Sequence, residues 1–292
     1  MDRLPHELIQ KIVGFYIEPV YQFRDWVNVR KLDWKSISKQ PRAINILTDH
    51  PHYIHWDAFS SNPRSIPLLE KNMDKINWFE LSSNQNAIPL LEKNPDKINW
   101  MRLSMNRSAI PLLEENMDKI DWYSLSMNPD AIPLLEKNMD KIHWDALSSN
   151  PNAVHILEKN IDKIDWNRLS FNTSAIPLLE KNMDKINWML LAANPSSIPL
   201  LIQNKDKVPW ILLASNPNVM SLINEFPNVM NDNWFCLCTR PNAIDFIEKN
   251  KDNYKMDWRG LSENPEIFEI NHVKTHARMM EESKLLSICF SS

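Results

Sequence analysis

At 292 residues, with 43% hydrophobic residues and a formal net charge of −4, the chain has room for one large domain or two smaller ones. Its 33 basic and 37 acidic residues give no general attraction to phosphates or anionic lipids, and no apolar run approaches the roughly 20 residues of a membrane span. Two glycines exclude folds built on Gly-rich phosphate loops, and three cysteines are too few for a disulfide framework, so we expect a reducing compartment.

The first 29 residues are predicted to form a helical cap. An amphipathic helix is expected to begin at Pro5, because proline is tolerated in the first turn of a helix. The segment lacks the layout of a secretory signal peptide.

From residue 34 onward, tryptophan recurs at a nearly fixed spacing. Trp34 to Trp210 form a series with a period of 22 residues, and Trp234 and Trp258 continue it with a spacing of 24. The best-kept unit reads W-x-x-L-S-x-N-P-x-A-I-P-L-L-E-K-N-M-D-K-I-N. A repeat of this length is typical of solenoids. Residues 30–271 are therefore predicted to be an array of about ten units.

Each unit is predicted to contain two short helices. One is expected to begin near Asp74, a good N-cap residue, and the other near Ser65 or Asn62, because Pro67 fits only a first turn. Helices this short are marginal alone and require stacking against neighbours. The sequence thus predicts an all-α, right-handed-type α-solenoid with terminal capping helices, about 90–100 Å long if it is straight.

Two series of asparagines take the place of the missing glycines. One lies six residues after each Trp, as at Asn128, and the other follows Glu-Lys, as at Asn138. Asparagine is the commonest residue after glycine at left-handed helix C-caps, so both series are predicted to cap helices. The alternative is a polar ladder that reads bases or peptide amides.

A variable stripe runs along the Trp helix. At about 100° per residue, Trp, the Leu at +3 and the Ser at +4 share one face, whereas positions +1, +2 and +5 share the opposite one. A constant face opposite a variable one is typical of a solenoid binding surface, and clustered exposed apolar residues often mark contact sites. The alternative is unselected solvent-exposed surface. The predicted partner-binding residues are Phe79, Met101, Arg102, Met105, Tyr123, Met127, Arg168, Phe171, Met189, Leu190, Ile211 and Leu212.

The stripe is most apolar late in the array, from Met189 to Leu212. A second contact patch, a dimer surface and an area covered by the C-terminal tail all remain open. Residues 272–292 are predicted to form a C-terminal capping helix and tail.

The sequence carries no recognisable catalytic motif. A phosphate-binding loop, a nucleophile elbow and a His-Glu-x-x-His pair are all missing, so we expect no enzyme, cofactor or small-molecule substrate. Cys236 and Cys238 with His272 and His276 form the one metal-like set, but their C-x-C spacing is poor and both cysteines occupy ordinary repeat positions. No metal site is predicted. RNA-reading repeats normally carry a basic groove, which the net charge does not favour.

At the N-terminus, the sequence Leu-Pro-His-Glu-Leu-Ile-x-x-Ile resembles the opening of an F-box, the motif that docks substrate receptors on Skp1 in cullin–RING ubiquitin ligases. V-N-V-R-K-L-D-W-K-S-I-S, which ends at Ser38, loosely resembles the last F-box helix, so the segment can extend to about residue 45, although Trp34 already belongs to the repeats. The alternative is a simple capping helix. The resemblance implies a Skp1 contact through Leu4, Pro5, Leu8, Ile9 and Ile12.

The repeat motif N-P-x-A-I-x-L-L-E-K-N-x-D-K-I-x-W is similar to a repeat family abundant in large DNA viruses of algae and amoebae. The resemblance implies a viral origin, with the protein in the host cytoplasm or the virion. We expect a non-catalytic protein–protein interaction scaffold, in its most concrete version a substrate-recruiting adaptor for a host Skp1–cullin ligase. The alternatives are a structural or assembly protein of the virus particle or factory and, less favoured, an RNA-binding repeat protein.

Overall fold

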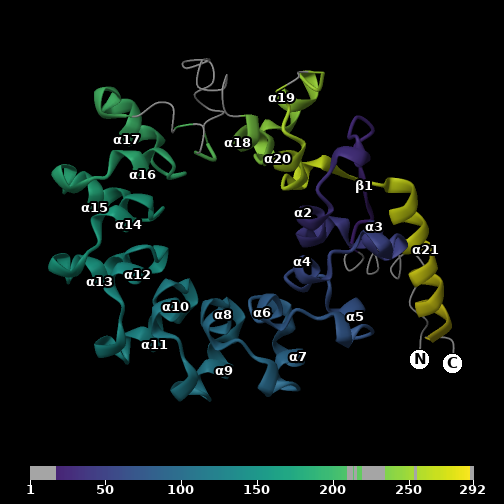
Figure 1. Cartoon of the computed structure of the whole chain (residues 1–292), viewed down its shortest axis with the longest axis horizontal. Helices are drawn as coiled ribbons and strands as arrows, with labels where there is room; N and C mark the ends of the chain where they lie inside the picture. The colour runs from purple at the N-terminus through teal and green to yellow at the C-terminus, as the bar shows by residue number, and fades with distance from the viewer. Residues whose placement is uncertain (1–17, 209–212, 214–215, 219–233, 253–254, 290–292) are drawn as a thin grey trace.

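In the computed structural model, residues 18–208, 213, 216–218, 234–252 and 255–289 are described. The predicted fold class is confirmed, because tandem helical repeats make up almost all of this part of the chain. The Trp helices lie in an inner layer and the second helices in an outer one (Figure 1). The inner helices are α2 (Trp34–Lys39), α4 (Trp56–Ser60), α6 (Trp78–Leu81), α8 (Trp100–Met105), α10 (Trp122–Met127), α12 (Trp144–Ser148), α14 (Trp166–Phe171), α16 (Trp188–Ala192), α18 (Trp234–Cys238) and α20 (Trp258–Ser262).

The outer helices begin with the Ile-Pro or equivalent step of each unit. Pro lies in the first turn, where its missing N–H costs nothing, as the sequence predicts. They are α3 (Ile44–Asp49), α5 (Ile66–Leu69), α7 (Ile88–Glu92), α9 (Ile110–Glu114), α11 (Ile132–Glu136), α13 (Val154–Glu158), α15 (Ile176–Glu180), α17 (Ile198–Gln203) and α19 (Ile244–Lys249).

The inner helices begin one turn later than predicted. Asp74 lies in a 3-10 turn, Met73–Lys75, and α6 begins at Trp78 with Asn77 as its N-cap. The prediction was wrong because Ile76 between them is extended, with ψ of 125°, and buries its side chain in the core. Where the residue before Trp is Asp or Asn, its side chain caps the helix, as where Asp121 Oδ1 accepts the Ser124 N–H at 2.8 Å; His55 and His143 make no such bond.

The first asparagine series connects neighbouring repeats. Asn128 is 1% exposed, its Oδ1 accepts the Asp130 N–H at 3.0 Å, and its Nδ2 donates to the carbonyls of Ser104 and Asn106 at 3.0 and 3.2 Å. Its φ of −77° is not left-handed, and no described residue other than Gly has a positive φ. The predicted left-handed C-caps are therefore wrong for this series, and its burial removes the ladder alternative.

The second series does cap the outer helices, but through side chains. Asn138 Nδ2 donates to the Leu134 carbonyl at 2.9 Å, with φ of −133° at Asn138 itself. The amide side chain supplies the donor that a left-handed residue would otherwise supply through its backbone.

In most repeats a Ser at +4 and a Lys three residues before the next Trp complete the junction. Ser126 Oγ donates to the Trp122 carbonyl at 2.7 Å and accepts the His143 N–H of the next repeat at 3.1 Å. Lys141 Nζ lies 4.7 Å from the centroid of the Trp122 ring. Seven of the described Trp rings, among them Trp56, Trp100 and Trp144, carry such a Lys contact, and on Trp34 the ring of Tyr53 takes its place at 4.0 Å.

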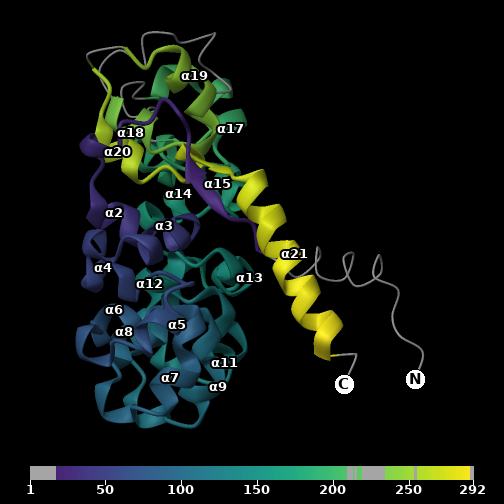
Figure 2. The same cartoon turned by 90° about the vertical axis from the view of Figure 1, so that its right-hand side faces the viewer.

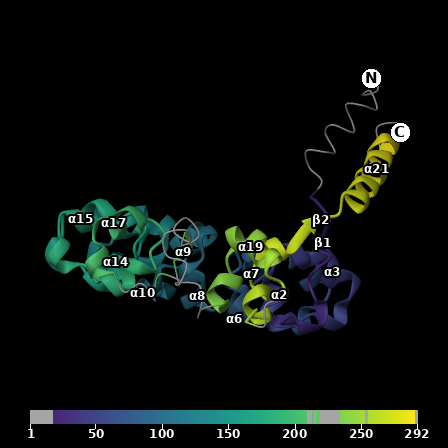
Figure 3. The same cartoon turned by 90° about the horizontal axis from the view of Figure 1, so that it is seen from above.

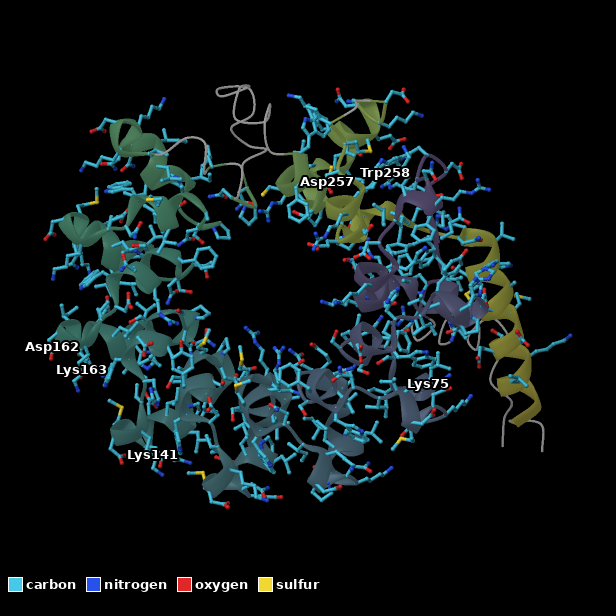
Figure 4. All side chains as sticks on the ribbon, in the orientation of Figure 1. Lys75, Lys141, Asp162, Lys163, Asp257 and Trp258 are labelled. Carbon is cyan, nitrogen blue, oxygen red and sulfur yellow. The ribbon has the colours of Figure 1, made fainter. Side chains whose placement is uncertain are left out.

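The stack is not straight but curves into a ring. The last repeat lies beside the first, where Asp33 N donates to Ser262 Oγ at 2.8 Å and Lys31 Nζ lies 5.1 Å from the Trp258 ring (Figures 1 and 4). The Trp series counts eleven repeats, and the inner helices of ten of them lie within the described residues. The two terminal repeats cover each other's open faces.

A short antiparallel sheet and one long helix lie at this junction. Strand β1 (Tyr21–Phe23) pairs with β2 (Phe268–Ile270), with Gln22 opposite Glu269. Helix α21 (His272–Cys289) follows β2 and extends away from the ring (Figures 2 and 3).

Candidate functional site: the inner wall of the ring

Helical geometry assigns the variable positions +1 and +5 to the central opening. Leu125, at +3 of α10, is 0% exposed, as are the equivalent leucines of the other described inner helices except Leu237, at 2%. Position +3 lies at about 300° around the helix, so the opposite direction, about 120°, falls between +1 and +5. Because the outer helices cover the other side of the inner layer, +1 and +5 face the opening, which remains clear when the described side chains are drawn (Figure 4).

A contact that skips a repeat shows the tight curvature of this wall. Arg168 of α14 donates through NH2 to the Tyr123 hydroxyl of α10 at 2.6 Å, past the intervening α12. Side chains two repeats apart meet only where the helices converge, on the concave side of the stack. Tyr123 and Arg168 therefore belong to the wall of the opening.

Position +2 differs from the predicted stripe because it lies partly between neighbouring inner helices. Ala58, Ser124 and Ala146 are buried at this position, and a Cβ on Gly260 would come within 2.6 Å of the Phe235 carbonyl oxygen. Curvature brings the inner helices closest on their concave side, so small residues fit there. The stripe thus divides into an exposed part at +1 and +5 and a packing position at +2.

The exposed part divides the wall into two arcs of different chemistry. Opposite the closing junction, Met189 is 62% and Phe171 52% exposed. We call the exposed apolar side chains of α6 to α16 the apolar arc: Phe79, Met101, Met105, Tyr123, Phe171, Met189 and Leu190. At the junction itself, the +1 and +5 side chains form a charged arc of Arg259, Glu263, Lys35, Lys39 and Asp57.

Two arginines at +2 extend over the apolar arc. The Arg102 guanidinium lies 4.2 Å from the Phe79 ring centroid, with Glu80 at 3.7 Å, and its buried Nε has no hydrogen-bond partner. The Arg168 guanidinium lies 5.6 Å from the Tyr123 ring. The hydrogen bond that Arg168 donates to the Tyr123 hydroxyl, together with the nearby carboxylates of Asp145 and Asp165, raises the pKa of Arg168 above its usual value.

The wall carries almost no net charge. Among the described +1 and +5 positions, Lys35, Lys39 and Arg259 are matched by three carboxylates, those of Asp57, Asp145 and Glu263. With eleven helices about 8–10 Å apart, the inner axes lie on a circle about 30–35 Å across, so helices about 10–12 Å thick leave an opening of about 20 Å. That width admits one or two helices, and the neutral wall gives no electrostatic attraction for a phosphate backbone.

Of the other predicted residues, Met127 at +5 is half-buried. Those outside the described residues are Ile211, Leu212 and the F-box-like Leu4, Pro5, Leu8, Ile9 and Ile12. Phe235, which is not among the predicted residues, is 40% exposed at +1 of α18, the helix that packs against α20. Its position in the repeat was the signal that could have found it.

Cys238 fills the +4 position of its repeat. It is buried and accepts the Asp257 backbone N–H, and burial raises its thiol pKa to about 11. Within the described ranges, no three His, Cys, Asp or Glu side chains gather as a metal-binding group. None of the described helices is both long enough and apolar enough to cross a membrane.

The fold and the wall together define a class: a helical repeat protein closed into a ring, whose inner wall has one apolar arc and one charged arc. No family model, curated protein or solved structure matches the chain.

Proposed function

We propose that this protein is a non-catalytic interaction scaffold that holds a helical segment of a partner protein against the apolar arc. The observation that supports it most is the row of exposed Met, Phe and Tyr side chains on the wall of the opening. Burying exposed apolar groups drives protein association, and an amphipathic helix places its apolar face in such a groove. Arg102 and Arg168 are paired with Glu80 and Asp145, but each guanidinium has five N–H donors, so acidic residues next to a partner's apolar anchors can share them.

A finer version makes the protein a substrate-recruiting adaptor for a host Skp1–cullin ubiquitin ligase. The resemblance of residues 4–12 to an F-box supports it. The described chain begins at residue 18, just before β1, on the side of the ring where α21 also lies. In this version the ring binds the substrate and the N-terminal segment binds Skp1. A structural or assembly role in a virus particle stays the alternative.

The test is a tagged pull-down from eukaryotic cells, read by mass spectrometry. The wall variant carries Met101→Ser, Met105→Ser and Phe171→Ser. A matched control carries Met73→Ser, Met139→Ser and Ile161→Ser, because these side chains are similarly exposed but lie in the 3-10 turns of the outer rim, beside the labelled Lys75, Lys141 and Asp162 (Figure 4). Partners that the wild type and the rim control retain and the wall variant loses support the proposal. Partners that all three retain equally would overturn it.

The adaptor version has its own arm in the same experiment. Leu4→Ala/Leu8→Ala is expected to lose Skp1 and cullin while it keeps the partners of the wall. If the wild type recovers no Skp1 or cullin, the adaptor version is wrong, and high abundance in purified particles would favour the structural role.

A further inference from the structure

The junction that closes the ring repeats several contacts of the internal junctions, although Gln40 replaces the buried asparagine there and donates to the Glu263 carbonyl at 2.7 Å. In the internal junctions, the residue before Trp donates its N–H to the previous Ser, and the Lys three residues before Trp covers the previous Trp ring. Asp33 with Ser262 and Lys31 with Trp258 do the same across the closure. The outer turn matches too: Arg42 donates to the Pro265 carbonyl at 2.7 Å, as Asn152 does to Pro129 at 2.9 Å.

The closing junction also carries a strand pair, an aromatic stack and an ion pair in addition to the contacts of a described internal junction. Strands β1 and β2 pair across it, and Phe23 stacks on Phe268 with centroids 4.9 Å apart. Arg42 forms an ion pair with Glu266 at 2.9 Å, and Arg24 donates to the Glu266 carbonyl at 2.8 Å. We call this set of contacts the clasp.

The clasp holds the closing junction, where the first and last repeats meet without being consecutive in the chain. The chain itself passes through every other junction, so separating two repeats elsewhere would leave the opening enclosed by the polypeptide. Only separation of β1 from β2, and of α2 from α20, gives the opening a way out to the side. The extra contacts at the clasp take the place of the covalent link that the other junctions have.

We infer that the ring encircles its partner and that the clasp opens to admit it. The inference rests on the proposed binding of a helix to the apolar arc. A helix with a free end can enter along the ring axis, but a helix within a longer folded chain can enter only through the clasp. The apolar arc lies across the opening from the clasp, so a segment that enters there meets the binding residues directly.

The experiment locks the clasp with a disulfide. Tyr21 and Ile270 are opposite each other in a pair that exchanges no backbone hydrogen bonds, since Asn271 N donates to Val20 O and Arg24 N to Ile267 O on either side. The Cα atoms of such pairs lie about 4.5 Å apart, within disulfide range. The variant Tyr21→Cys/Ile270→Cys, with Cys236→Ser and Cys289→Ser, is compared with itself after reduction.

The probes are two forms of one 18-residue amphipathic helix with leucines on one face and glutamates beside them. One form has free ends, and the other carries a green fluorescent protein at each end. Oxidation is expected to slow association of the blocked form at least about 100-fold and of the free form less than about 3-fold, because a closed ring offers the blocked form no route of entry. Arg24→Ala/Arg42→Ala in the otherwise wild-type ring should load the blocked form faster.

Equal association of the blocked probe with locked and reduced rings would overturn encirclement and leave binding to the apolar arc standing. Failure of the free-ended probe to bind the reduced ring would overturn both. Binding of the free-ended probe to the locked ring also verifies that the locked protein is folded.

Discussion

Replacing one buried asparagine, Asn128→Ala, gives a quantitative test of what holds neighbouring repeats together. The substitution removes three hydrogen bonds, but the Asn106 carbonyl keeps the Ala109 N–H at 3.1 Å. The Ser104 carbonyl and the Asp130 N–H lose the side-chain partner that Asn128 gives them. At about 1–3 kcal/mol for each of these two groups, the cost is about 2–6 kcal/mol.

The assay is urea unfolding followed by far-ultraviolet circular dichroism, with Asn152→Ala as the matched control. Asn152 also bridges two repeats, through its Nδ2 and the Pro129 carbonyl, but it is exposed and water can replace the bond. Its loss should cost no more than about 1 kcal/mol. If Asn128→Ala lowers the free energy of unfolding no more than Asn152→Ala does, the buried amide side chains do not hold neighbouring repeats together.

Three further perturbations test packing, titration and the junction serine. Gly260→Ala should cost about 1–3 kcal/mol on urea unfolding, because its Cβ would overlap the Phe235 carbonyl oxygen, and an unchanged midpoint would contradict the close approach of α18 and α20. Since burial raises the Cys238 pKa to about 11, the folded protein holds the proton that the unfolded chain loses above pH 9, so stability should fall between pH 9 and 11 by about 2 kcal/mol more in the wild type than in Cys238→Ser. Parallel pH profiles of the two proteins would count against that burial. Ser126→Ala should cost about 1–2 kcal/mol by removing the partner of the partly buried His143 N–H, and a loss like that of an exposed serine would show that water replaces the bond.

Much of the architecture could be predicted from the sequence because the period of the tryptophans sets the repeat directly. The Pro in each second helix also locates its first turn. The start of the inner helix could not be located in the same way, since Asp118 and Asp121 are both good caps three residues apart. The burial of Ile120 between them decides the matter, and burial depends on the neighbouring repeat.

The binding surface was predictable only in part. Positions +1 and +5 follow from helical periodicity, whereas the packing role of +2 depends on a curvature that accumulates from small rotations at each junction. One signal of closure was present: Lys31 and Asp33 keep the junction residues of an internal repeat, although residues 1–29 do not match the repeat motif. In an open array these residues would have no Trp ring and no Ser hydroxyl to meet.

Closure also fixes how many repeats the gene can carry. An open solenoid gains or loses a unit at little cost, because each unit contacts only its neighbours. A ring of eleven must turn about 33° at every junction, and one of ten about 36°, so loss of a single unit would require every remaining junction to change by about 3° or the circle to stay open. Duplication and deletion of the 22-residue unit, the usual way in which repeat proteins diversify, should therefore be selected against here, and variation should instead concentrate on the residues at +1 and +5.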